Sequence, residues 1–171
     1  VKISLALLIG LTAIIVGGRL SYAQTTSTWM QLFPPSGTQP PPTDGHSAVY
    51  DATNDKMIVF GGNMGVCCPT FLSNNVWILS NASGVGGTPT WTLLSPIGTP
   101  PSARASHTAV YDPTTNRMII FGGSKEEGGF IMPTNDVWIL TNANGEGGTS
   151  TWTQLSPVGG PPPARAQHTA V

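Results

Sequence analysis

Three histidines recur at one interval and are the first residues of this sequence that could act together. His46, His107 and His168 are 61 residues apart. Imidazole nitrogens bind zinc, but all of them must lie within about 2.0–2.1 Å of one ion. Because each histidine belongs to its own copy of a repeating unit, we expect the rings to diverge and predict no metal site. We interpret each as a partly buried histidine that hydrogen-bonds backbone at the start of a strand.

The second group of chemically reactive residues is a pair of adjacent cysteines, Cys67 and Cys68. They have no nearby histidine, so they make a weak metal site. Gly128 and Gly129 stand 61 residues later, which indicates the tip of a tight turn. Export would favour oxidation, so we predict a disulfide between the two neighbours. Free or intermolecular thiols are the alternatives, because such a link is strained.

Glycine pairs close two nearly identical apolar runs. "MIVFGG" at 57–62 returns as "MIIFGG" at 118–123. A phosphate-binding loop would need a following helix and a Lys-Ser/Thr pair, and neither pattern is present. We therefore predict a structural role, in which glycine allows positive φ and close backbone approach as the chain leaves a strand. The residues concerned are Gly61, Gly62, Gly122 and Gly123.

These residues belong to a repeat that must position them. Residues 46–62 and 107–123 are identical at eleven of seventeen positions. Each copy predicts four strands, and in the first copy they are 46–51, 57–60, 76–79 and a strand from Trp91. The second and third strands are continuously apolar, which indicates burial on both faces. The fourth mixes Thr and Gln with Leu, as an outer strand does. Each period is therefore expected to be a four-stranded antiparallel sheet.

The combined pattern resembles the Kelch family of β-propellers. The resemblance is carried by the glycine pairs, by Trp77 and Trp138 on the third strands, by Trp91 and Trp152 on the fourth, and by Arg-x-x-His at 104–107 and 165–168. It implies an all-β propeller domain over 24–171, similar to the central domain of galactose oxidase. One departure is Thr43, which stands where Arg104 and Arg165 stand in the later copies.

The repeat count predicts part of a propeller. Blades are expected at 46–94 and 107–155, with the last strand of a preceding blade at 29–32 and the start of a following one at 168–171. Because a propeller closes with about 4–8 blades, we expect further blades in a longer chain. Assembly of several short chains into one ring is the alternative.

The N-terminal segment predicts export. Lys2 precedes a 16-residue apolar stretch, and Ser21-Tyr22-Ala23 offers the small residues that a signal peptidase reads. We predict a signal peptide at 1–23 and a secreted or periplasmic protein. An uncleaved membrane anchor is the alternative, because Arg19 closely follows the apolar run.

Charge and loop composition favour a binding role. The chain has 7 Lys+Arg and 8 Asp+Glu without charge runs, so no nucleic-acid surface is expected. The connections from strand two to three and from strand four to one should emerge on one face. Exposed aromatic and arginine side chains there suit protein or glycan contact. The candidate ligand-binding residues are Arg104, Arg165, Phe71, Phe130 and Met132. A structural role is the alternative for the two arginines, which could pair with backbone carbonyls or with an aspartate of a neighbouring blade.

We therefore expect an exported binding module without a cofactor rather than an enzyme. The family resemblance leaves two alternatives, a galactose-oxidase-like copper oxidase and a sugar mutarotase, with the active site in other blades. The copper site of that resemblance needs a Tyr-His pair, and this chain has none. Tyr50 and Tyr111 are repeat positions, which indicates packing.

Overall fold

The structure is a computed structural model that describes residues 11–16, 19–24, 31–32, 38–65 and 71–171. The chain divides into two units, Val1–Leu32 and Phe33–Val171. In the first unit, β1 (Leu11–Val16) pairs antiparallel with β2 (Arg19–Gln24). Among the residues described, no helix is long and apolar enough to cross a membrane. The signal peptide at 1–23 stays a prediction.

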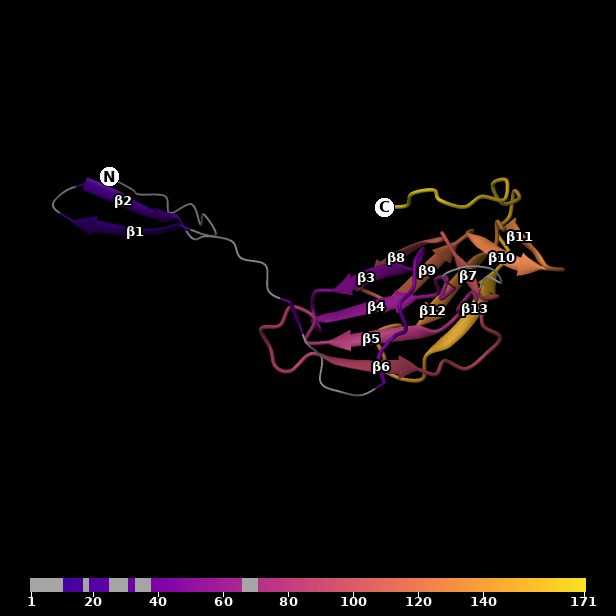
Figure 1. The fold of residues 1–171 in the computed structure, drawn as a ribbon, viewed down its shortest axis with the longest axis horizontal. Coiled ribbons are helices and arrows are strands. Elements are labelled where there is room, and N and C mark those ends of the chain that lie inside the picture. The colour runs from indigo at the N-terminus through magenta and orange to yellow at the C-terminus, as the bar shows by residue number, and fades with distance from the viewer. Residues whose placement is uncertain (1–10, 17–18, 25–30, 33–37, 66–70) are drawn as a thin grey trace. The chain divides into compact units, whose positions relative to one another are not determined.

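The second unit contains two four-stranded antiparallel sheets (Figure 1). Blade 1 has the order β3-β4-β5-β6. Its strands are β3 (Ser47–Asp51), β4 (Lys56–Phe60), β5 (Val76–Ser80) and β6 (Thr90–Leu94). Blade 2 has the matching order β8-β9-β12-β13. Its strands are β8 (Thr108–Asp112), β9 (Arg117–Phe121), β12 (Val137–Thr141) and β13 (Thr151–Leu155). Each strand of blade 2 begins 61 residues after its counterpart, so the predicted all-β fold with two complete four-stranded antiparallel blades is confirmed.

The partial blades predicted at 29–32 and 168–171 are only partly described by the structure. Residues 29–30 lie outside the described part, and 31–32 are not in a strand. Residues 168–171 are described and are likewise not in a strand. In blade 2 the first strand, β8, pairs with the second strand, β9. The blades predicted before and after these two stay predictions.

One connection predicted as a loop is a β-hairpin. In blade 2, β10 (Ser124–Glu127) and β11 (Phe130–Pro133) pair, and β10 also pairs with β7 (Arg104–Ala105). Gly128 and Gly129 form the turn with φ of 62° and 83°, as the expected tight turn requires. Cys67 and Cys68, at the matching place in blade 1, lie outside the described residues. Their disulfide stays a prediction.

The apolar core lies between the two blades. It is formed by Ile58, Phe60, Val76, Met118, Ile120, Trp138, Leu140, Ala143 and Trp152. Trp77 is also buried, and Trp91 on β6 is half-buried. The continuous burial predicted for the third strand holds in blade 1. In β9 and β12 burial alternates, because one face packs on blade 1 and the other, with Ile119 and Ile139, is half-buried. β6 is mostly exposed, as expected of an outer strand.

The glycine pairs have the structural role predicted from the sequence. All four residues have positive φ, between 62° and 103°. A Cβ added at Gly61 would lie 2.8 Å from the carbonyl oxygen of Arg104, and one at Gly122 would lie 2.8 Å from that of Arg165. Only glycine fits where strand two ends, because the next connection crosses directly over it.

Candidate binding site

The structure brings the predicted connections together at one end of the blades. Gly62 N donates to the Arg104 carbonyl over 2.8 Å, and Gly123 N donates to the Arg165 carbonyl over 2.9 Å. In blade 1, Asn63 of the β4–β5 connection forms bridges with Asp44, which precedes β3, and with Leu72 of the same connection. We call this end the link face. It is formed by the connections from strand two to strand three of each blade and by the segments that lead into each first strand. Every candidate ligand-binding residue named from the sequence belongs to a connection at this end.

Arg104 lies beneath the link face and not on it. Its side chain is 0% exposed. Its guanidinium donates two parallel hydrogen bonds to the Asp136 carboxylate, over 2.7 and 2.8 Å, and one to the Gly122 carbonyl over 2.9 Å. Its Nε donates to Ser102 O. The backbone of Arg104 bonds blade 1 at Gly62, so this residue joins the two blades and offers nothing to a ligand.

Asp136 completes that buried pair. Burial alone would raise the pKa of its carboxyl, but hydrogen bonds from Arg104, Trp138 and Thr134 outweigh burial and hold the pKa well below its usual range. The indole of Trp138 donates to it over 2.6 Å. A bidentate, charge-assisted pair of this kind fixes geometry as well as adding energy.

The pair explains why Thr43 departs from the repeat. Thr43 stands where blade 2 has Arg104, and Asn75 stands where blade 2 has Asp136. Both partners are therefore neutral in blade 1. A lone arginine or aspartate would leave a charge unpaired near the interior, which is costly.

Arg165 is exposed, unlike its counterpart Arg104. Its Nε donates to the carbonyl of Pro163, as Arg104 donates to Ser102, and its backbone bonds Thr134. The backbone role is therefore repeated. Arg165 stays a candidate for ligand contact.

Two of the three repeat histidines, His107 and His168, join successive repeats. His107 shares a hydrogen bond of 2.8 Å with the Ser47 hydroxyl and meets the Phe60 ring edge-on at 5.1 Å. His168 does the same with Thr108 at 3.0 Å and with Phe121 at 5.1 Å. The partner is a hydroxyl of the preceding repeat, not the backbone that we predicted. His46 is exposed and shares a bond with Thr43.

His107 is held neutral at physiological pH. Burial, followed by the charge of Arg104, lowers the pKa of its imidazole to about 4. Its Nδ1 is buried and has no hydrogen-bond partner among the residues described. Protonation would place a charge on that nitrogen between the two blades, which the interior disfavours.

The apolar candidates are exposed. Phe130 is 70% exposed, Phe71 58% and Met132 49%, and Ile131 between them on β11 is also exposed. Monomeric proteins scatter single apolar residues over their surfaces, but a contiguous group marks a contact site. Three of these residues are consecutive on β11, so the hairpin presents an apolar edge.

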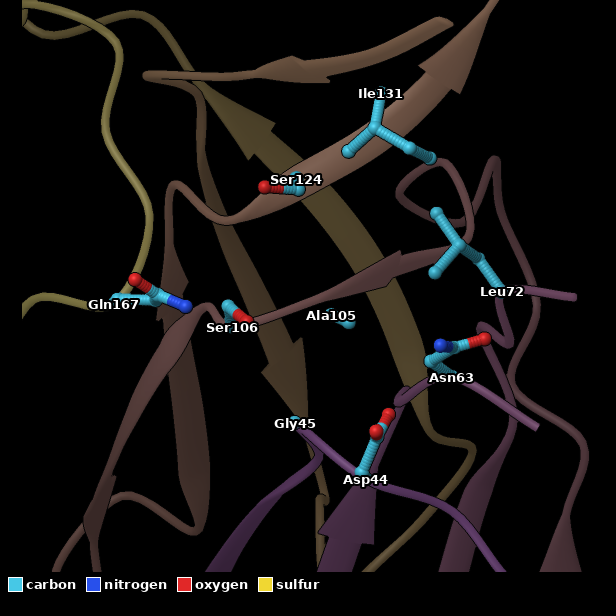
Figure 2. Close-up of a pocket in the computed structure, with 9 residues that line it drawn as sticks. All are labelled: Asp44, Gly45, Asn63, Leu72, Ala105, Ser106, Ser124, Ile131 and Gln167. Atoms are coloured by element: carbon cyan, nitrogen blue, oxygen red, sulfur yellow. The ribbon is translucent and has the colours of Figure 1, made fainter. Parts of the chain in front are cut away.

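A pocket of about 520 Å³ opens on the link face. Its walls come from the segments that precede β3 and β8, from the β4–β5 connection, from the hairpin of β10 and β11, and from Gln167 (Figure 2). The lining residues are Asp44, Gly45, Asn63, Leu72, Ala105, Ser106, Ser124, Ile131 and Gln167. Sequence reasoning named none of them. The available signal was their spacing, because Gly45, Ser106 and Gln167 each precede a repeat histidine by one residue.

These three residues share an unusual backbone. Gly45, Ser106 and Gln167 have φ of 61°, 57° and 58°. Ser106 N donates to Gly45 O over 2.7 Å, and Gln167 N donates to Ser106 O over 2.9 Å. Positive φ is uncommon for serine and glutamine and is often found at functional sites. The backbone is thus constant at these positions while the side chain differs.

The opposite end of the blades holds a polar network with a structural role. Asp51 is buried and accepts hydrogen bonds from the Tyr111 hydroxyl over 3.0 Å and from the Asn144 amide over 2.8 Å. Lys56 Nζ donates to Asn144 O and to Glu146. Burial, then the hydrogen bond to Asp51, raises the pKa of Tyr111. In blade 1 the Tyr50 hydroxyl donates to Asp55 of the same blade. In the described ranges, no group of three or more His, Cys, Asp or Glu side chains is placed to hold a metal ion.

Four-stranded blades whose glycine pairs, histidines and arginine join one repeat to the next define a β-propeller protein. The family model described as "KLHDC2/KLHL20/DRC7 Kelch-repeats domain" matches residues 6–171. The chain belongs to the Kelch-repeat family.

Several proteins share the repeat. The chain is 32% identical over 123 residues to Rho GTPase-activating protein gacHH of Dictyostelium discoideum, which covers 71% of this chain and 7% of that protein. It is 30% identical over 125 residues to dynein regulatory complex subunit 7 of Chlamydomonas reinhardtii, 67% of this chain and 10% of that protein. It is 26% identical over 192 residues to Rab9 effector protein with kelch motifs of Xenopus laevis, 83% of this chain and 50% of that protein. The chain therefore spans half or less of each relative.

These matches support the Kelch repeat and give no support to the galactose-oxidase-like subtype predicted from the sequence. The same matches give no support to the copper oxidase and mutarotase alternatives.

Proposed function

We propose that this chain is a protein-binding module that holds an extended segment of a partner protein on its link face. The observation that carries the proposal is the position of the apolar edge of β11 directly beside the pocket, since Ile131 belongs to both. Extended segments bind well where an apolar surface adjoins a few polar groups that fix orientation.

A protein partner fits this surface better than a glycan. The exposed side chains of the hairpin are apolar, and aromatic residues and methionine are enriched where proteins bind one another. The names of two relatives support a protein partner, because one is a subunit of a dynein regulatory complex and the other a Rab9 effector. We propose no cofactor and no catalytic role.

The proposal is tested by selecting binders to the full chain from a displayed library of random dodecapeptides. Affinity of a selected peptide is then measured by fluorescence anisotropy. The double variant Phe130→Ser/Met132→Ser should weaken binding at least tenfold, because it removes the apolar edge. Val85→Ser is the matched control, since Val85 is 89% exposed in the connection at the opposite end of blade 1. Equal loss in both variants, or no selected peptide, would refute the proposal, and a glycan array would then test the carbohydrate alternative.

We also propose that the protein is exported, on the strength of Lys2, the apolar stretch and Ser21-Tyr22-Ala23. Expression of the full chain in a secreting host should release a product that begins at Gln24. Intact-mass measurement checks this, and a product that keeps residues 1–23 would argue for the anchor.

A further inference from the structure

We propose that the pocket on the link face accepts a basic side chain, arginine or lysine, of the bound partner segment. This inference rests on the proposed function and adds the chemistry that the pocket selects. It follows from three properties of the pocket, which are its charge, the division of its walls and the backbone at its base.

The charge of the pocket is negative. Asp44 is the one formally charged residue among the nine that line it. Its backbone pairs with Asn63, but no side chain within the described part of the chain donates to its carboxylate. Figure 2 shows that this carboxylate points into the space between Gly45 and Asn63. A bound cation would gain a charge-assisted hydrogen bond there, and a bound anion would be repelled.

The cations of the link face do not cancel this charge. Arg104 is buried against Asp136. Lys125 pairs with Glu127 over 2.8 Å on the hairpin. Arg165 is exposed, but it lies outside the lining and donates to Pro163. Asp44 therefore sets the sign of charge that the pocket prefers.

The walls suit a side chain with an apolar stem and a polar head. Leu72 and Ile131 lie on one side of the pocket, and Ser106, Ser124 and Gln167 lie on the other (Figure 2). Arginine and lysine bury their methylene stems on apolar surface while the charged head bonds polar groups. Serine hydroxyls and the glutamine carbonyl can accept the remaining N–H groups of such a head.

The base of the pocket is set by the repeated backbone. Residues 45, 106 and 167 have nearly the same positive φ although their side chains differ, so the lining varies between repeats on a constant backbone. The repeat also supplies a safe substitution at Asp44, because Ala105 and Ala166 stand at its equivalent positions. Asp44→Ala therefore removes the carboxylate and introduces the residue that the two equivalent positions of the repeat already have.

The test extends the peptide selection described above, with the full chain and the random dodecapeptide library as probe. Selected peptides should be enriched in arginine or lysine. Replacing the basic residue of the tightest peptide by neutral citrulline or norleucine should weaken binding at least tenfold. Asp44→Asn and Asp44→Ala should each cause a similar loss with the original peptide. Glu126→Gln, which also removes one carboxylate but lies outside the lining, should change affinity less than twofold.

The outcomes separate the two proposals. Peptides that lose affinity in Phe130→Ser/Met132→Ser but show no basic enrichment, or bind Asp44→Asn unchanged, would overturn the basic-side-chain inference and leave the proposed function standing. Equal losses in Glu126→Gln and Asp44→Asn would overturn the inference too, because the charge effect would not be local. A library that yields no binder would overturn both.

Discussion

Blade 1 and blade 2 have the same strand order and backbone course, but they differ in the side chains at the contacts between repeats. Their strands begin at the same positions of the repeat, and both have a glycine pair after the second strand. At the link face, however, Thr43 and Asn75 of blade 1 replace the ion pair of Arg104 and Asp136. The comparison shows that the apolar pattern and glycines build a blade, whereas charged pairs are added or removed together.

The opposite end of the blades gives the same lesson. Tyr50 of blade 1 donates to Asp55, and Tyr111 of blade 2 bonds the equivalent Asn116. In blade 2 this local pair also bonds Asp51 of blade 1, so it becomes part of the contact between blades. A repeated local network thus gains a second role where a neighbouring blade lies against it.

The largest expected effect tests the ion pair. Arg104→Ala should lower the free energy of unfolding by about 4 kcal/mol, because Asp136 keeps a partly buried charge without its partner. Urea denaturation of the full chain measures this. Thr43→Ala, at the matching position of blade 1, is the control and should cost under about 1 kcal/mol.

A second variant sharpens that comparison. Arg104→Thr/Asp136→Asn gives blade 2 the two residues that blade 1 carries and leaves no unpaired charge. It should be more stable than Arg104→Thr alone. If the double variant were the less stable of the two, the explanation of Thr43 and Asn75 as a matched neutral pair would be wrong.

The next effect concerns pH. The pKa of His107 is about 4 in the folded state and near 6.5 when unfolded, so the unfolded chain binds the extra proton between these values. Stability from neutral His107 is therefore complete above about pH 6.5 and falls by about 3 kcal/mol as pH drops to 4. His107→Gln should remove most of this slope. Urea midpoints from pH 4 to 7 check it, and identical slopes would contradict the role of His107.

The glycine comparison should give a smaller effect. Gly61→Ala should cost about 2 kcal/mol, because φ is +69° and the new Cβ would meet the Arg104 carbonyl. Gly128→Ala shares a positive φ but has open space around it, so it should cost about 1 kcal/mol. Thermal and urea unfolding measure the difference. Equal costs would mean that φ alone requires glycine at position 61.

The smallest expected effect concerns the end of the blades opposite the link face, where equivalent residues of the two blades can be compared. Asn144→Ala removes an amide that bonds buried Asp51, and it should cost about 1.5 kcal/mol. Ser83→Ala, at the equivalent position of blade 1, removes an exposed bond to Asp55 and should cost under about 0.5 kcal/mol. Urea unfolding of both variants provides the measurement, and equal losses would show that the contact with the neighbouring blade adds nothing.

Sequence reasoning predicted the strands well and the site only in part. Apolar runs and glycine pairs depend on local geometry, so their spacing predicted blade positions to within a residue or two. Phe71, Phe130 and Met132 were expected to be exposed in the connections between strands, and they are exposed. For Arg104 the sequence left ligand contact and a structural pair both open, because its partner Asp136 is 32 residues away and nothing local shows that the two meet. Asp44 and Ser106 were missed because a pocket is assembled from several connections at once.

The sequence by itself determined the repeat, the strand order within each blade and the need for glycine after each second strand. Hydrophobic periodicity and backbone sterics act over a few residues, and a repeated pattern repeats their result. Only the tertiary structure decided that Arg104 is buried, that His107 bonds a hydroxyl of the preceding blade, and that Asp44 points into a pocket beside an apolar hairpin. These outcomes depend on which side chains two blades bring together, because burial and pairing are properties of the contact and not of either segment alone.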